Sequence, residues 1–179
     1  MSNEHASLAQ LRADFRATST VSMPLAGTLL WTVAAVLSLI LPLRVLAFVV
    51  AGGSGLIFPL AILIDRMRGR NLVSAGRDNP VLANFMGGIV TIGLLWPLVI
   101  IAGFTHPLII VLGAAVLMAL VWIPYGWSAD DPVGRHHAVG RTLAAYAAYL
   151  FVPAPLTATA ICGVVIAAYV YSFARMRRN

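Results

Sequence analysis

The stretch Ala47–Arg70, AFVVAGGSGLIFPLAILIDRMRGR, decides the fold of this chain. It begins as an apolar run, carries glycines at Gly52, Gly53 and Gly55, passes through Pro59, and ends in a basic segment. About 20 apolar residues are enough for a helix to cross a bilayer. We therefore predict that this stretch contains the second of six transmembrane helices, with the other five packed around it.

Composition supports a membrane protein and excludes a soluble enzyme domain. Of the 179 residues, 60% are hydrophobic and 10% are charged, and the mean hydropathy is +0.91. Soluble domains carry about 25% charged residues, so this chain has too few polar side chains to cover a surface in water. Six spans of roughly 20 residues each would use most of its length.

Proline and charged residues mark the ends of the predicted spans. The spans are expected at about 24–41, 45–64, 80–102, 107–123, 138–152 and 156–174. The fifth is the weakest, because it is short and crosses the membrane only if Arg141 extends to the lipid headgroups. The chain then divides into an amphipathic N-terminal segment (1–22), a six-helix transmembrane domain (23–174) and a basic tail (175–179).

The N-terminal segment is predicted to contain a short helix. Ser7 and Gln10 have the spacing of a capping box, and Leu8, Leu11 and Phe15 follow at helical intervals. This pattern is typical of an amphipathic helix that lies in the membrane interface. A helix that binds a partner is the alternative.

Arginine placement predicts the orientation. The net charge is +6, and the chain contains no lysine, so arginines carry the positive charge. Eleven of the twelve arginines fall in the tails and in the even-numbered loops, and only Arg44 lies on the opposite side. Positive residues gather on the cytoplasmic side of membrane proteins, so we expect an all-α protein of the bacterial inner membrane, built as three hairpins with both termini in the cytoplasm. The basic residues are interpreted as anchors to lipid phosphates rather than as a nucleic-acid surface, and the main ones are Arg66, Arg68, Arg70, Arg175, Arg177 and Arg178.

No arrangement of side chains predicts catalysis. All six acidic residues lie in tails or loops rather than at membrane depth, where a functional charge is usually found. His136 and His137 are adjacent, so they point in different directions on a helix, and we interpret both as solvated imidazoles. We predict that the protein is not an enzyme and holds no metal and no cofactor.

The glycine cluster has two interpretations. Ala51 and Gly55 form a small-xxx-small pair, which lets a second helix approach closely; alternatively, the glycines and Pro59 break the helix and expose backbone carbonyls to a substrate. Packing is the preferred interpretation, and similar pairs elsewhere suggest a homo-oligomer built through small-residue helix faces. The residues that would form a substrate pocket or helix break are Gly52, Gly53, Gly55, Pro59, Trp96 and Tyr125.

Four short motifs resemble a family of small bacterial membrane proteins. They are Leu11-Arg-Ala-Asp-Phe15, Gly55-Leu-Ile-Phe-Pro-Leu60, Asn79-Pro80 and Ile123-Pro-Tyr-Gly-Trp127. The family is a domain of unknown function, and the resemblance covers about residues 8–152. It implies a bacterial inner-membrane protein with six helices but no activity and no functional residues.

Two functions remain open. A small permease or carrier for neutral or lipidic molecules predicts a polar, water-accessible cavity around the glycine cluster, Trp96 and Tyr125. A scaffold or regulatory subunit without transport predicts a solid core and an outward apolar groove for a partner helix. In either case the lipid bilayer is the expected environment.

Overall fold

The computed structural model describes residues 6–18, 21–69 and 78–176, and within these ranges every regular element is a helix. The all-α prediction is confirmed. The helices are α1 (Leu8–Thr18), α2 (Ser22–Leu37), α3 (Leu43–Met67), α5 (Pro80–Gly93), α6 (Trp96–Thr105), α7 (Leu108–Leu120), α8 (Trp122–Ala129), α9 (Val133–Phe151) and α10 (Thr157–Arg175).

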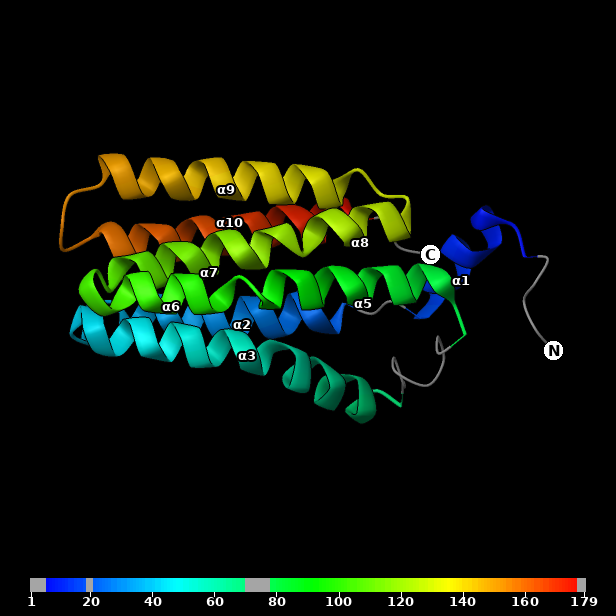
Figure 1. Ribbon diagram of the computed structural model, residues 1–179, viewed down its shortest axis with the longest axis horizontal. Coiled ribbons are helices and arrows are strands. Elements are labelled where there is room, and N and C mark those ends of the chain that lie inside the picture. Colours follow the sequence, from blue (N-terminus) through cyan, green and yellow to red (C-terminus); the bar gives the residue numbers. More distant parts are fainter. Residues whose placement is uncertain (1–5, 19–20, 70–77, 177–179) are drawn as a thin grey trace.

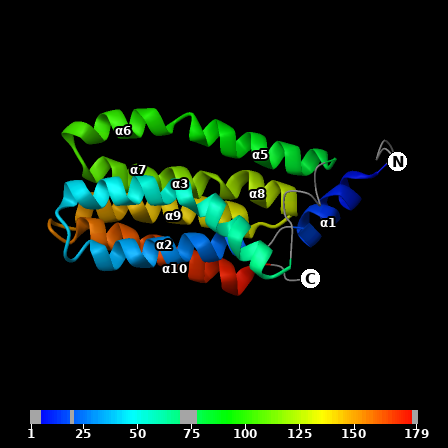
Figure 2. The same ribbon diagram turned by 90° about the horizontal axis from the view of Figure 1, so that it is seen from below.

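The long helices lie side by side as a bundle (Figure 1). Helices α5 and α6 follow each other along one line, as do α7 and α8, so each pair forms one rod. The connections at 38–42, 106–107 and 152–156 lie at one end of the bundle, here called the turn end. Helix α1 and the C-terminal end of α10 lie at the other, here called the tail end (Figures 1 and 2).

Four of these rods are long and apolar enough to cross a membrane. They are α3, α5 with α6, α7 with α8, and α10. A fifth is added if α1 and α2, which meet at 51°, are counted as one broken span. Helix α9 falls outside this set, since its 19 residues include two arginines and two histidines. By length and composition, these four or five candidate spans indicate a membrane protein.

Local sequence sets the start of two helices, and the predicted capping box is confirmed. Asn79 is the N-cap of α5, where its Oδ1 accepts from the Val81 N–H at 2.8 Å, and Pro80 follows at the first helical position. At α1, the Ser7 N–H donates to Gln10 Oε1 at 2.8 Å and the Gln10 N–H donates to Ser7 Oγ at 3.3 Å, which completes the capping box.

Prolines divide two predicted spans. The third was expected as one helix over 80–102 but consists of α5 and α6, and the fourth consists of α7 and α8 and continues to Ala129. A proline cannot donate to the carbonyl four residues earlier, and its ring clashes with that carbonyl. Helix α5 ends at Gly93, four residues before Pro97, and α7 ends at Leu120, four residues before Pro124.

Helix α3 remains one helix through the glycine cluster, so the alternative of a helix broken there is wrong. Pro59 lies inside the helix, and α3 bends away from the bundle toward its C-terminal end (Figure 1). The preferred packing interpretation also needs correction. A Cβ at Gly55 or Gly52 would meet nothing within 4 Å, whereas one at Gly53 would clash with the Leu30 side chain of α2. Gly53 is therefore the residue that permits close approach.

Five rods form the packed core, and one stands at its side. Helix α2 packs on α3 and α10, α10 on α9, α9 on α7, and α7 on α3, which closes a ring. The α5–α6 rod is the least buried of the four apolar spans. It packs on α7, α8 and α1 and makes few contacts with α3. The seam between α3 and α5–α6 is where the packing is incomplete.

Candidate functional site: an apolar groove beside a buried arginine

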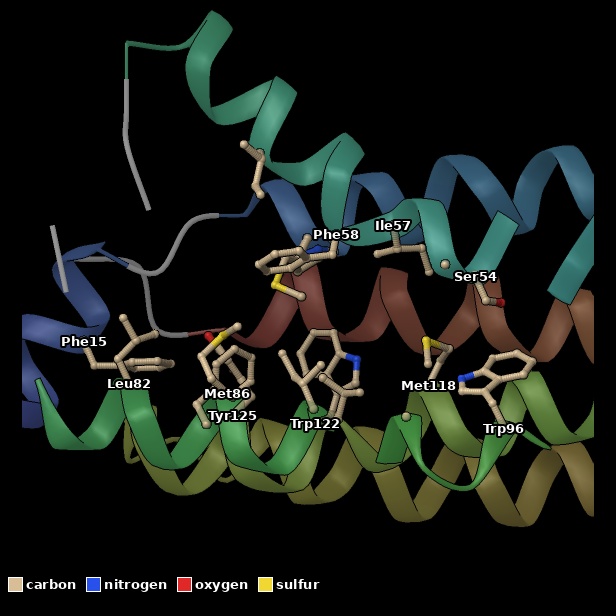
Figure 3. A pocket seen from close by; sticks show the side chains of 18 of the residues that line it. Phe15, Ser54, Ile57, Phe58, Leu82, Met86, Trp96, Met118, Trp122 and Tyr125 are labelled. Carbon is tan, nitrogen blue, oxygen red and sulfur yellow. The ribbon is translucent and has the colours of Figure 1, made fainter. Parts of the chain in front are cut away.

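A cavity of about 650 Å³ occupies the seam between α3 and α5–α6. One wall is formed by α3 and the other by α5 with the start of α6, while α7, α8 and α10 form the floor (Figure 3). Pockets that bind small molecules enclose about 300–1,000 Å³. Gly55, Ala83 and Gly93 line this cavity and are also exposed, so it is a groove that reaches the surface.

The groove brings together three of the six residues predicted for a pocket. Gly55, Trp96 and Tyr125 line it, although they lie on α3, α6 and α8. Gly52, Gly53 and Pro59 are not among its lining residues. The groove instead takes Ser54, Ile57 and Phe58 from α3 (Figure 3).

Aromatic side chains bound the groove at its tail end. At the tail end, Phe15 of α1 lines it and is only 3% exposed; its ring lies 5.6 Å from that of Phe85 and 6.2 Å from that of Tyr125. Nearer the turn end, Phe48 of α3 contacts Phe104 of α6 at 6.4 Å. The lining residues of α3 lie within 54–62, so the groove covers part of the bundle rather than its whole length. Phe15 is covered by protein, so the apolar side of α1 packs at least in part on the bundle, and its placement in the membrane interface stays a prediction.

The groove is apolar, which corrects the prediction of a polar cavity. Its lining consists mainly of Met, Ile, Leu, Phe and Trp side chains. The Ser54 hydroxyl donates to the Val50 carbonyl of its own helix at 2.8 Å. Tyr125 belongs to an aromatic cluster, with its ring 5.3 Å from that of Trp122. This surface suits an apolar ligand.

Behind the floor lies a charged cluster that the sequence analysis did not identify. Arg141 of α9 is 1% exposed, and its guanidinium carbon lies 5.5 Å from the ring of Trp31 and 5.4 Å from the ring of Tyr169. Within the described part of the chain it has no carboxylate partner, and Arg141 Nε, Arg141 Nη2 and Trp31 Nε1 are buried without an acceptor. Cation–π contacts offset about 2 kcal/mol of a desolvated charge, well below the several kcal/mol that burying an ion costs.

His137 connects the arginine to the groove. Its ring stacks on Trp122 at 4.0 Å and contacts Tyr169 at 5.2 Å, and both of these side chains line the groove. His137 Nδ1 lies 2.6 Å from Ser172 Oγ, and Nε2 lies 3.4 Å from Arg141 Nη1. A guanidinium can only donate, so Nε2 is the acceptor and Nδ1 carries the proton that is donated to Ser172.

Two sequence interpretations of this region are wrong. Arg141 was expected near a helix end, extending to the headgroups, but α9 begins five residues earlier than predicted and places Arg141 near its middle. His137 was expected to be solvated but is 1% exposed, whereas His136 is exposed. The signal that was missed is the i, i+4 spacing of His137 and Arg141, continued on the same face by Ala145 and Ala148.

The structure describes three of the six arginines predicted as lipid anchors. Arg66, Arg68 and Arg175 are exposed near the tail end. Arg70, Arg177 and Arg178 lie outside the described residues. Because Arg141 is buried in the bundle, it no longer counts among the eleven arginines from which the orientation was predicted.

The chain was compared with protein families, curated proteins and solved structures. A family of unknown function (DUF7010) matches residues 8–177. This range confirms the resemblance stated above and extends it beyond Pro153, where no likeness was found from the motifs. No curated protein and no solved structure matches the chain.

Proposed function

We propose that this chain, which belongs to the DUF7010 family of unknown function, is a bacterial inner-membrane protein that binds a lipid-like molecule and acts as a carrier or small permease for it. The observation that carries the proposal is the apolar groove of about 650 Å³ between α3 and α5–α6. Its mouth faces the direction from which a molecule dissolved in the bilayer would enter.

The orientation belongs to the same proposal. We infer six spans, in which α2 and α9 cross the membrane beside the four apolar rods, with both termini in the cytoplasm. Helix α9 has 19 residues and a length of about 28 Å, close to the bilayer core of about 30 Å. Its arginine and histidine at positions 141 and 137 face the bundle rather than lipid.

The groove favours a lipid tail over a partner helix. A transmembrane partner would need a furrow that runs the whole length of the bundle and accommodates a rod about 10 Å wide. Here Phe15 closes one end of the groove, and the lining residues of α3 lie within 54–62, so the groove does not run the whole length of the bundle. An acyl chain needs no such length and can extend through the mouth into the bilayer.

The test is photolabelling of the full chain in phosphatidylcholine vesicles with a diazirine-bearing fatty alcohol. Labels are expected on groove residues of α3 and α5. Gly55→Leu and Gly93→Leu should reduce labelling several-fold, since a Cβ at either position meets nothing within 4 Å and the side chain would project into the groove.

Matched controls lie on the same helices. Gly52→Leu on α3 and Gly87→Leu on α5 also have open space at Cβ but do not line the groove, so they should label like the wild type. Absence of label from the groove, or equal loss in all four variants, would reject the proposal and favour the alternative, a scaffold without transport.

A further inference from the structure

The buried cluster behind the groove contains donors without acceptors. Arg141 Nε, Arg141 Nη2 and Trp31 Nε1 are buried and unpaired among the described residues, and the guanidinium lies over the Trp31 ring. Buried donors in proteins are almost always paired, and a charge at membrane depth usually has a function. The positive charge is thus only partly compensated, and a negative charge nearby would stabilise it.

Among the described residues, no carboxylate lies beside Arg141 to offset its charge. An ion pair between Arg12 and Asp130, at 3.2 Å, lies at the tail end. The neighbours of Arg141 are Trp31, Tyr169 with its hydroxyl, and His137, which accepts through Nε2. A negatively charged molecule bound nearby would offset this charge.

The groove is the route by which such a molecule reaches the cluster. Tyr169 lines the groove with one part of its surface and lies 5.4 Å from the Arg141 guanidinium carbon. Trp122 also lines the groove and stacks on His137. One layer of aromatic rings thus separates the groove floor from the positive charge, and aromatic rings screen a charge far less than water does.

We propose that Arg141 makes the groove selective for amphiphiles with a singly charged acidic headgroup, a carboxylate or a phosphodiester. The headgroup would sit against Tyr169 and Trp122 at the floor, with its tail along the groove toward the mouth. A single arginine matches a single negative charge. This inference rests on the proposed function, because it needs an apolar tail in the groove.

The experiment compares two probes that differ only in the headgroup. A diazirine-bearing fatty acid and the fatty alcohol of the same chain are offered, at alkaline pH, to the full chain in phosphatidylcholine vesicles. The wild type should label with the acid about tenfold more strongly than with the alcohol, the factor expected for a charge pair across one ring layer. A diazirine-bearing phosphatidylglycerol distinguishes a phosphodiester headgroup from a carboxylate.

Variants assign the selectivity to Arg141. Arg141→Gln should label equally with acid and alcohol, and Arg141→Lys should keep part of the preference. Arg135→Gln is the matched control, because Arg135 lies on the same helix but is exposed; it should keep the full preference. If Arg141→Gln does not fold, the comparison of acid with alcohol in the wild type and in Arg141→Lys still tests whether Arg141 provides the selectivity.

The failures of the two proposals are distinguishable. Equal labelling of the wild-type groove by acid and alcohol would overturn the role of Arg141 and leave the groove as an apolar site. Absence of label from the groove with every probe would overturn the proposed function itself. A preference for the acid that survives in Arg141→Gln would also reject the inference, since another group would then provide the charge.

Discussion

At the scale of single residues, Gly134 sets the distance between α8 and α9. A Cβ at this position would clash with the Trp122 carbonyl and lie 2.5 Å from Gly126 Cα and 2.6 Å from Gly126 N, all of them backbone atoms of the neighbouring helix. Backbone cannot move aside as a flexible side chain can. We expect Gly134→Ala to lower stability by about 1–3 kcal/mol, measured by thermal unfolding in detergent.

The control for this prediction lies on the same helix. A Cβ at Gly140 would meet nothing within 4 Å, and alanine has the higher helix propensity by about 1 kcal/mol, so Gly140→Ala should leave stability unchanged or raise it. Equal effects of the two substitutions would show that α8 and α9 do not pack through Gly134.

The protonation of His137 is a second prediction at this scale. Because Arg141 Nη1 donates to Nε2, the proton is on Nδ1 and is donated to Ser172 Oγ. Nitrogen-15 NMR of labelled histidine should show one neutral ring with its proton on Nδ1. Ser172→Ala should cost about 1–3 kcal/mol, because it leaves a buried donor unpaired. A ring protonated on Nε2 instead would contradict this geometry.

The same cluster shows why single residues are hard to place from sequence. Arg141 breaks an apolar run, and in isolation the most economical interpretation is a side chain that extends to the headgroups. Its burial depends on Trp31 of α2 and Tyr169 of α10, which come from distant parts of the chain. The spacing from His137 to Arg141 indicated a shared face, but not which face the bundle covers.

At the scale of elements, α1 acts as a cap on the tail end of the groove. Arg12 pairs with Asp130 at 3.2 Å and Arg16 donates to the Ala129 carbonyl at 3.0 Å. Phe15, between them, is buried against Phe85 and Tyr125. A polar rim and one aromatic anchor hold the helix in place.

Phe15→Ala should therefore release α1. Removal of a buried phenylalanine costs about 3 kcal/mol, so trypsin should cleave after Arg12 and Arg16 about a hundredfold faster than in the wild type, as followed by mass spectrometry of protein in detergent. Leu8→Ala is the control, since Leu8 is on the same helix but 49% exposed. Unchanged cleavage in Phe15→Ala would show that α1 is held by its ion pair alone.

Elements were predictable where the determinant is local. The Asn79-Pro80 start of α5 and the capping box of α1 depend on a few adjacent residues, and the capping box was predicted. The divisions before Pro97 and Pro124 follow from a local rule as well, and could have been found by counting back four residues. The bend of α3 without a break could not be predicted, because neighbouring helices decide whether a proline bends or ends a helix.

At the scale of the whole molecule, the groove arises from unequal packing. Helices α2, α3, α7, α9 and α10 enclose each other, whereas α5–α6 packs mainly on α7, α8 and α1. The bend in α3 carries its end away from α5 (Figure 2), which widens the seam. Gly55, Trp96 and Tyr125 could be predicted as pocket residues from the sequence, but the neighbours of each rod could not. The prediction of the pocket residues was therefore partly correct, and the prediction of a polar pocket was wrong.

The last prediction concerns the crossing of α9, on which the six-span orientation depends. Cys162 is buried, so single cysteines introduced elsewhere can be labelled in intact cells with a membrane-impermeant maleimide. Arg135 and Ala154 are exposed and lie beyond or near the two ends of α9. If α9 crosses, Ala154→Cys should label in intact cells and Arg135→Cys only after permeabilisation.

Two reference positions calibrate that experiment. Thr105 and Asp78 are exposed at opposite ends of the apolar α5–α6 rod, so Thr105→Cys should label from outside and Asp78→Cys should not. Labelling of Arg135→Cys and Ala154→Cys from the same side would mean that α9 does not cross. The charge of Arg141 would then lie outside the bilayer core, and its role in selecting acidic amphiphiles would lose its physical basis, because water would screen it.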